Sequence, residues 1–279
     1  MIQIQNKFYS CVETRIQSQG EMYARFHLGT FFRGQALTVA NALRRTLLGE
    51  LPCLIVTKVH IDGVVHEFSS IPGVQESVLD ILLNLKRLTF TISNKKFNIF
   101  SNSSLKTKVF LKIRGPAKVT AADLKLPPHL ACVWPNHYIA TLSSNAELAC
   151  VLELTVVHPK QKISISKNEV GSKNKIFGKV TNQVLEKGKG TESKKILTDS
   201  IENNKEKNKK IFSLDTNYSP IRKVNYVIYE LDSKKNSEYL VLEVVTDGSI
   251  EPKQALRFAF KQLTKLFYEF TQISKNVNS

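Results

Sequence analysis

An amphipathic helix near the C-terminal end limits most strongly how this chain can fold. The pattern predicts a helix from about Glu251 to Ile273, with Pro252 in the first turn, where proline is favoured. Such a helix would be roughly 35 Å long, with its apolar residues inside an arc of about 140°. A second copy of the chain is the simplest cover for so large a stripe, and packing in the chain's own core is the alternative. The stripe consists of Leu256, Ala259, Phe260, Leu263, Leu266, Phe267, Phe270 and Ile273.

Two more helices are expected in the first third of the chain. The first runs from about Ala36 to Glu50, with Asn41 and Arg45 just beyond the edge of its apolar arc and Arg44 inside it. The arc consists of Leu37, Ala40, Leu43, Leu47, Leu48 and Leu51. The second helix, 75–86, is apolar on two sides, so it is either sandwiched between layers or offers one side to a partner.

Strand-like segments account for most of the remaining sequence. Segments 11–19 and 21–29 predict two strands joined by a turn, and the β-branched segment 54–61 predicts a third. Short strands are expected at LTFTI, KFNIF, KVFLKI, HYIATL and ELACVLELTVV, and two more strands, within 211–231 and 238–249, predict a meander. The pattern as a whole predicts an α+β fold with a β-rich middle.

The positive charge of the chain is concentrated in one segment. Residues 158–210 contain 14 lysines and six acidic residues, so they carry +8, which is half of the formal net charge of +16. The segment has one aromatic residue and no sustained periodicity, and we expect it to be flexible or loosely structured. A basic chain can bind nucleic acid, so a free-standing nucleic-acid-binding module is an alternative function.

The residue pattern does not indicate catalysis or metal binding. His66 and Glu67 are adjacent, but no second histidine follows at metal-ligand spacing, so a hydrolase that uses this pair is only an alternative. The four cysteines stand singly, which predicts reduced thiols and no zinc site. No apolar run approaches the roughly 20 residues that a membrane span needs.

Several separated motifs resemble the alpha subunit of bacterial and plastid RNA polymerase. They are NALRRTLL, IDGVVHEFSSIPGVQESVLDILLNLK, YSPIRKVNY and VVTDGSIEPKQAL, in the order of the family, over about 24–157 and 211–270. The resemblance implies a dimerisation domain of strands and two long helices, made by 1–52 and 211–279. Residues 53–157 would form an inserted β-rich domain, and 158–210 would be a further Lys/Asn-rich insertion.

The resemblance also implies subunit contacts. The chain would be a homodimeric platform for the β and β′ (or split β′/β″) subunits of an enzyme that transcribes DNA into RNA from the four ribonucleoside triphosphates. The implied β contacts are Asn41, Arg44, Arg45, Leu48, Asp62, Gly63, His66 and Glu67. The implied β′ contacts are Asp80, Lys86, Pro220 and Arg222. The implied dimer seam consists of Leu37, Leu47, Leu256, Phe260, Leu263, Phe267 and Phe270.

Periodicity favours a solvated Arg45 and an Arg44 that extends from the rim of the core to water. If Asn41 and Arg45 contact a partner protein instead, Arg44 would be held inside the fold by a carboxylate or by backbone carbonyls. Further expectations follow from the resemblance. No catalytic residue, metal ligand or cofactor is expected in this chain, since Mg²⁺ would be bound by the catalytic large subunit. Sigma factor and DNA would be reached only through the assembled enzyme.

The family usually continues into a C-terminal DNA-binding domain, and this sequence stops before it. That difference, the Lys/Asn bias and the lack of a transit peptide favour a plastid-encoded subunit in the chloroplast. The bacterial cytoplasm is the alternative location.

Overall fold

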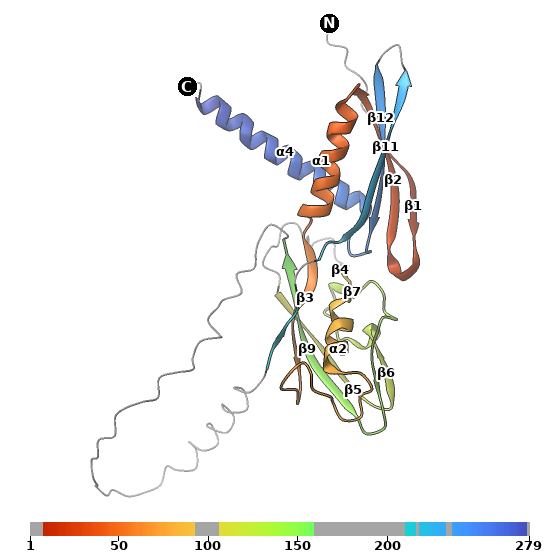
Figure 1. Cartoon of the computed structure of the whole chain (residues 1–279), viewed down its shortest axis with the longest axis vertical. Coiled ribbons are helices and arrows are strands. Elements are labelled where there is room, and N and C mark those ends of the chain that lie inside the picture. The colour runs from red at the N-terminus through yellow and green to blue at the C-terminus, as the bar shows by residue number, and fades with distance from the viewer. Residues whose placement is uncertain (1–7, 93–105, 159–209, 216–217, 233–235, 278–279) are drawn as a thin grey trace, which may run out of the picture. The chain divides into compact units, whose positions relative to one another are not determined.

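The chain folds around two hydrophobic cores. The computed structural model describes residues 8–92, 106–158, 210–215, 218–232 and 236–277, and within them the fold is α+β, as predicted (Figure 1). Elements from the two ends of the chain build one core, here called the terminal core. Elements between them build the second, here called the central core. Most of the predicted 158–210 insertion and the predicted strand KFNIF lie outside the described residues.

The terminal core contains a four-stranded antiparallel sheet in the order β1-β2-β12-β11. Its strands are β1 (Phe8–Ile16), β2 (Met22–Phe32), β11 (Ile221–Asp232) and β12 (Ser237–Thr246), and a short 3-10 helix, η1 (Ser18–Gly20), connects the first two. Helices α1 (Gln35–Glu50) and α4 (Pro252–Val277) pack against this sheet (Figure 1). The predicted N-terminal strand pair and the predicted meander are both confirmed.

Helix α1 is buried along one side only. Ala40, Leu43 and Leu47 are fully enclosed in the terminal core, whereas Leu37 and Leu48 of the same predicted arc are exposed. The helix begins after Gly34, whose φ of +86° is costly for any residue with a Cβ. The chain itself therefore covers only part of the predicted apolar arc of α1.

The central core contains a second four-stranded sheet in the order β10-β3-β9-β5, and two strand pairs, β4-β7 and β6-β8. The sheet strands are β3 (Cys53–Ile61), β5 (Lys106–Arg114), β9 (Glu147–Val157) and β10 (Phe212–Ser213). The paired strands are β4 (Phe90–Ile92), β6 (Ala117–Thr120), β7 (Leu130–Cys132) and β8 (Tyr138–Leu142), with a 3-10 helix, η2 (Ala121–Asp123), between β6 and β7. Strand β10 corrects one predicted boundary, because Phe212 was assigned to the dimerisation domain but is buried in the central core.

Helix α2 (Val78–Lys86) packs on the central core and begins three residues later than predicted. Its start is fixed by a capping box, in which Ser77 Oγ accepts from the Asp80 N–H and Asp80 accepts from the Ser77 N–H. One side of the helix is buried through Val78, Ile81, Leu82 and Leu85. Leu79 and Leu83 on the other side stay exposed. Within the single chain, the helix is therefore not sandwiched between two layers, and one apolar side remains free for a partner.

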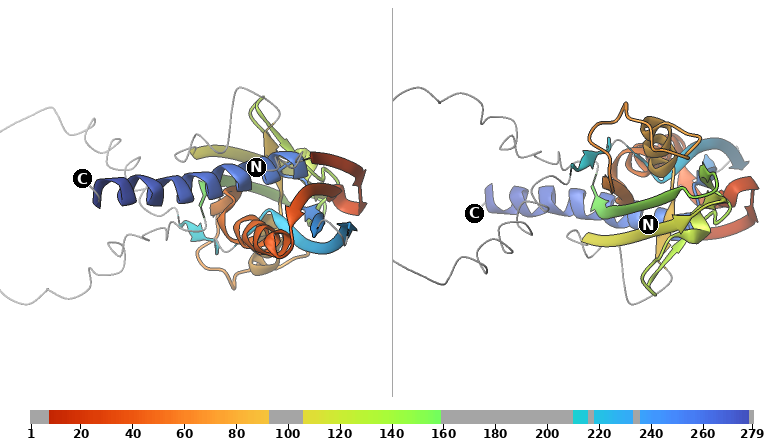
Figure 2. Two further views of the ribbon diagram at one scale, coloured as in Figure 1. Left: turned by 90° about the horizontal axis from the view of Figure 1, so that it is seen from above. Right: turned by 90° about the horizontal axis from the view of Figure 1, so that it is seen from below.

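Helix α4 carries the apolar stripe that the sequence predicts. Its first turns lie in the terminal core, where Ala255, Leu256 and Ala259 are fully buried. Figure 2 shows the C-terminal half of the helix extending away from the sheet. None of the described helices is both long and apolar enough to cross a membrane.

Candidate functional site

The first predicted contact surface lies on the outer side of α1. Asn41, Arg44, Arg45 and Leu48 are all exposed there. The exposure of Arg44 corrects the hypothesis that a carboxylate or backbone carbonyls hold it inside the fold, and agrees with the alternative in which it extends from the rim of the core to water. Asn41 is fixed by the sheet beneath it, since the Tyr226 hydroxyl donates to Asn41 Oδ1 over 2.9 Å.

The second part of the predicted β contact is the loop after β3. Gly63 turns the chain with a φ of +78°, and Asp62, His66 and Glu67 are exposed. His60 Nε2 lies 3.1 Å from Asp62 Oδ1. The loop adjoins the central core through the buried Val64, whereas α1 belongs to the terminal core, so the predicted β contacts are distributed over both.

Two apolar residues of this loop are exposed as well, one inside the predicted contact segment Asp62–Glu67 and one just beyond it. Val65 is 70 % exposed and Phe68 is 76 % exposed. Large apolar side chains at this exposure often mark a contact with another protein, and aromatic residues contribute strongly to binding energy there. Sequence periodicity could not find them, because the loop has no regular repeat from which an exposed side can be derived.

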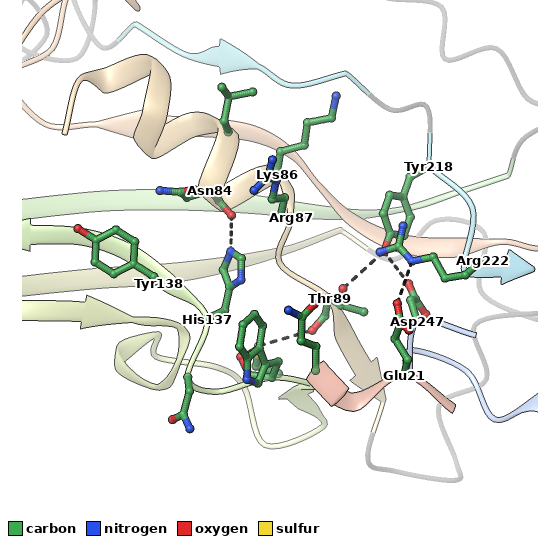
Figure 3. A pocket seen from close by; sticks show the side chains of 15 residues that line it. Glu21, Asn84, Lys86, Arg87, Thr89, His137, Tyr138, Tyr218, Arg222 and Asp247 are labelled. Atoms are coloured by element: carbon green, nitrogen blue, oxygen red, sulfur yellow. Dashed lines mark hydrogen bonds and ion pairs between the residues drawn. The ribbon is translucent and has the colours of Figure 1, made fainter. Parts of the chain in front are cut away.

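A cleft of about 770 Å³ brings together two of the predicted β′ contacts that are 136 positions apart, Lys86 and Arg222 (Figure 3). The other two do not line it. Asp80 lies in the capping box of α2, and Pro220 is buried with its carbonyl accepting from the Asp247 N–H over 3.0 Å. The cleft is lined by residues from segments around both cores: Gln19, Glu21, Leu83, Asn84, Lys86, Arg87, Thr89, Cys132, Trp134, Asn136, His137, Tyr138, Tyr218, Arg222 and Asp247.

The charged groups of the cleft are mostly paired. Lys86 Nζ lies 3.2 Å from Asp215 Oδ2, and Arg222 Nε lies 3.9 Å from Glu21 Oε1. Near Lys86 on α2, the Asn84 carbonyl oxygen lies 3.0 Å from His137 Nε2 (Figure 3). The cleft presents polar and aromatic side chains, which are residue types that protein–protein interfaces use.

The predicted dimer seam is divided between surface and core. Leu37, Phe267 and Phe270 are exposed, and Phe260 and Leu263 are half-buried against the terminal core. Leu47 and Leu256 are fully buried within the chain's own core, so they were wrongly placed on the seam surface. Leu266 and Ile273 extend the exposed part of the stripe.

The described residues contain no cluster of three or more histidine, cysteine, aspartate or glutamate side chains that could hold a metal ion. All four cysteines are free thiols, of which Cys53 and Cys150 are buried. Burial raises the pKa of both buried thiols to about 12, so they stay protonated and unreactive at neutral pH.

Comparison with known proteins decides the family. Residues 59–175 match the family model of the RNA polymerase Rpb3/RpoA insert domain. The DNA-directed RNA polymerase subunit alpha of Chlorella vulgaris is 42 % identical over the full length of both chains. The chain belongs to the DNA-directed RNA polymerase alpha subunit family. The alpha subunit of Cyanidium caldarium is 36 % identical over 92 % of this chain and 68 % of its own length. That of Gloeobacter violaceus is 35 % identical over 91 % and 67 %.

The resemblance drawn from the sequence motifs is therefore confirmed. As a member of this family, the chain acts as an alpha subunit in the transcription of DNA into RNA. The alternatives of a free-standing nucleic-acid-binding module and of a hydrolase are set aside, because full-length similarity to an alpha subunit explains the whole chain.

Proposed function

We propose that this alpha subunit is a homodimeric, non-catalytic platform on which the β and β′ subunits assemble. The observation that carries the proposal is the exposed end of the α4 stripe. Leu266, Phe267, Phe270 and Ile273 are between 45 % and 64 % exposed in the single chain. A row of large, exposed apolar side chains on a helix marks a surface for contact with another protein. A second copy provides the same stripe, as a symmetric dimer requires.

The proposed β contact uses the outer side of α1 and the loop at 62–68. Arginine is among the residues that contribute most to protein interfaces. We expect Arg45→Ala to weaken β capture about tenfold, through loss of one such contact, and to leave the dimer intact. Binding of purified β to the immobilised dimer measures this effect.

Arg15→Ala is the matched control for that experiment. Arg15 is an exposed arginine on β1, at the opposite edge of the terminal sheet from β11, and its removal changes the net charge equally. If Arg45→Ala and Arg15→Ala bind β equally well, α1 does not hold β through Arg45.

The proposed β′ contact is the cleft between Lys86 and Arg222. It is supported by the convergence of two family-matched positions from distant segments on one depression of the surface (Figure 3). Leu83, exposed at its rim, adds an apolar anchor. In this proposal phosphodiester formation from ribonucleoside triphosphates, with its Mg²⁺, belongs to the large subunits. Sigma factor and DNA bind to the assembled enzyme.

The proposed location is the plastid, with the gene in the plastid genome. It is supported by the similarity to alpha subunits from the algae Chlorella vulgaris and Cyanidium caldarium. Sequencing of purified organelle DNA tests it. A gene found only in nuclear or bacterial DNA contradicts it.

A further inference from the structure

The side chain of Tyr218 lies where the two hydrophobic cores meet. Its ring packs against Cys53, Ile55 and Val157, which form a small cluster at the start of β3 and the end of β9. Its carbonyl oxygen accepts from the Cys53 thiol over 3.6 Å. The ring is thereby attached to the sheet of the central core.

The hydroxyl of Tyr218 reaches the terminal core. It donates to Asp247 Oδ2 over 2.7 Å, directly after β12, and accepts from Arg222 Nη2 of β11 over 3.2 Å. Thr89 Oγ1, next to β4 of the central core, lies 3.5 Å away. Because the single hydroxyl proton is used for Asp247, Thr89 is the donor in this last bond. One hydroxyl thus connects groups from both cores (Figure 3).

Asp247 makes this hydroxyl difficult to replace. The residue is only 3 % exposed, and its Oδ1 accepts from Ser249 N over 2.9 Å and from Ser249 Oγ over 2.5 Å. Tyr218 supplies the donor for its Oδ2. Burial and the nearby Asp247 carboxylate raise the pKa of Tyr218, so the phenol keeps the proton that it donates. A buried carboxylate without this donor is unfavourable.

Close packing near Tyr218 also limits how the two cores can move relative to each other. Val133, which follows β7 beside the central core, lies against Gly20 and Gly248, which flank strands of the terminal core. A Cβ added to either glycine would collide with Val133 Cγ1. The Val133 N–H donates to the Thr89 carbonyl oxygen over 3.0 Å, which joins this packing to the Tyr218 hydrogen bonds.

We infer that Tyr218 is a positioning residue that holds the terminal and central cores in one fixed orientation. That orientation sets the separation of Lys86 on one wall of the cleft from Arg222 on the other. The inference rests on the proposed β′ contact. A partner that must touch both walls binds more weakly when the walls move, because binding then has to order them.

Hydrogen exchange of the full-length dimer tests the positioning role without any partner. We expect Tyr218→Phe to speed amide exchange at 89–92, 130–134 and 246–250, and to leave α1 and β9 unchanged. Tyr23→Phe is the matched control, because its hydroxyl also joins a carboxylate (Glu243, 2.9 Å) and an arginine (Arg25, 3.2 Å), but within one sheet. Unchanged exchange at the three segments, or the same change in both variants, overturns the inference.

Binding of β′ to the purified complex of the dimer with β tests the consequence. We expect Tyr218→Phe to lower the affinity for β′ roughly tenfold below that of Tyr23→Phe, because the partner must now order the cleft. Both variants should keep the mass of the dimer. If the wild-type complex binds no β′, the proposed β′ contact fails, and the exchange experiment alone decides the role of Tyr218.

A double variant separates positioning from charge burial. In Tyr218→Phe/Asp247→Asn a neutral amide replaces the buried carboxylate. We therefore expect the double variant to regain the thermal stability that Tyr218→Phe alone loses, while its affinity for β′ stays low. Recovery of the affinity would mean that Tyr218 only satisfies a buried charge, and would overturn the positioning role.

Discussion

Phe267→Asp is expected to convert the dimer into folded monomers. Phe267 is 64 % exposed in the single chain, so an aspartate there meets water and does not disturb the terminal core. In the proposed dimer the same carboxylate would be buried without a partner, which costs several kcal/mol. We therefore expect the dissociation constant of the dimer to rise by about 100-fold or more. Light scattering coupled to size-exclusion chromatography measures the mass.

Tyr268→Asp is the control for this prediction. Tyr268 is the next residue on α4 and is similarly exposed, but it lies about 100° around the helix, off the apolar stripe. It should leave the dimer intact. A dimeric Phe267→Asp variant, or equal dissociation of both variants, would show that the stripe is not the dimer seam.

Gly248→Ala is expected to have the largest effect on folding stability. Gly248 has a φ of +85°, and an added Cβ would collide with the Gly20 carbonyl oxygen and lie 2.6 Å from Val133 Cγ1. The backbone conformation costs an alanine about 1–2 kcal/mol. Overpacking adds about 1–3 kcal/mol, because the colliding atom belongs to the backbone and cannot rotate away. Urea denaturation at a fixed protein concentration measures the loss.

Gly34→Ala separates the two contributions. Gly34 has nearly the same φ, +86°, but an added Cβ there meets no atom within 4 Å. We expect this variant to lose only the roughly 1–2 kcal/mol of the backbone contribution. Equal losses in the two variants would show that Gly20, Gly248 and Val133 do not pack as tightly as the structure indicates.

The elements with a regular repeat could be predicted from the sequence. Helices α1 and α4 and the β11-β12 meander follow from periodicity, because each buries one side against a continuous core. The start of α2 was predicted three residues too early. The capping box of Ser77 and Asp80 makes Ser77 the N-cap, so the residues before it belong to the loop. Strand β10 was misassigned because two residues carry no periodic signal, and only pairing with β3 places them.

The candidate site was harder to predict, since it depends on contacts between distant segments. Periodicity indicates that Leu47 and Leu256 are apolar, but it cannot tell the chain's own core from a partner's surface. The bonds of Tyr218 to Thr89 and Asp247 span 129 and 29 positions, without a motif that announces them. The family resemblance implied Lys86 and Arg222 as β′ contacts, and only the fold brought them to one cleft.

Native mass spectrometry of the chain, co-expressed with both large subunits, tests the platform proposal most directly. The proposal predicts a complex with two copies of this chain for each β and each β′ (or β′/β″ pair). It also predicts that Phe267→Asp abolishes this complex and Tyr268→Asp does not. A complex with a single copy, or large subunits that assemble equally well without this chain, would contradict it.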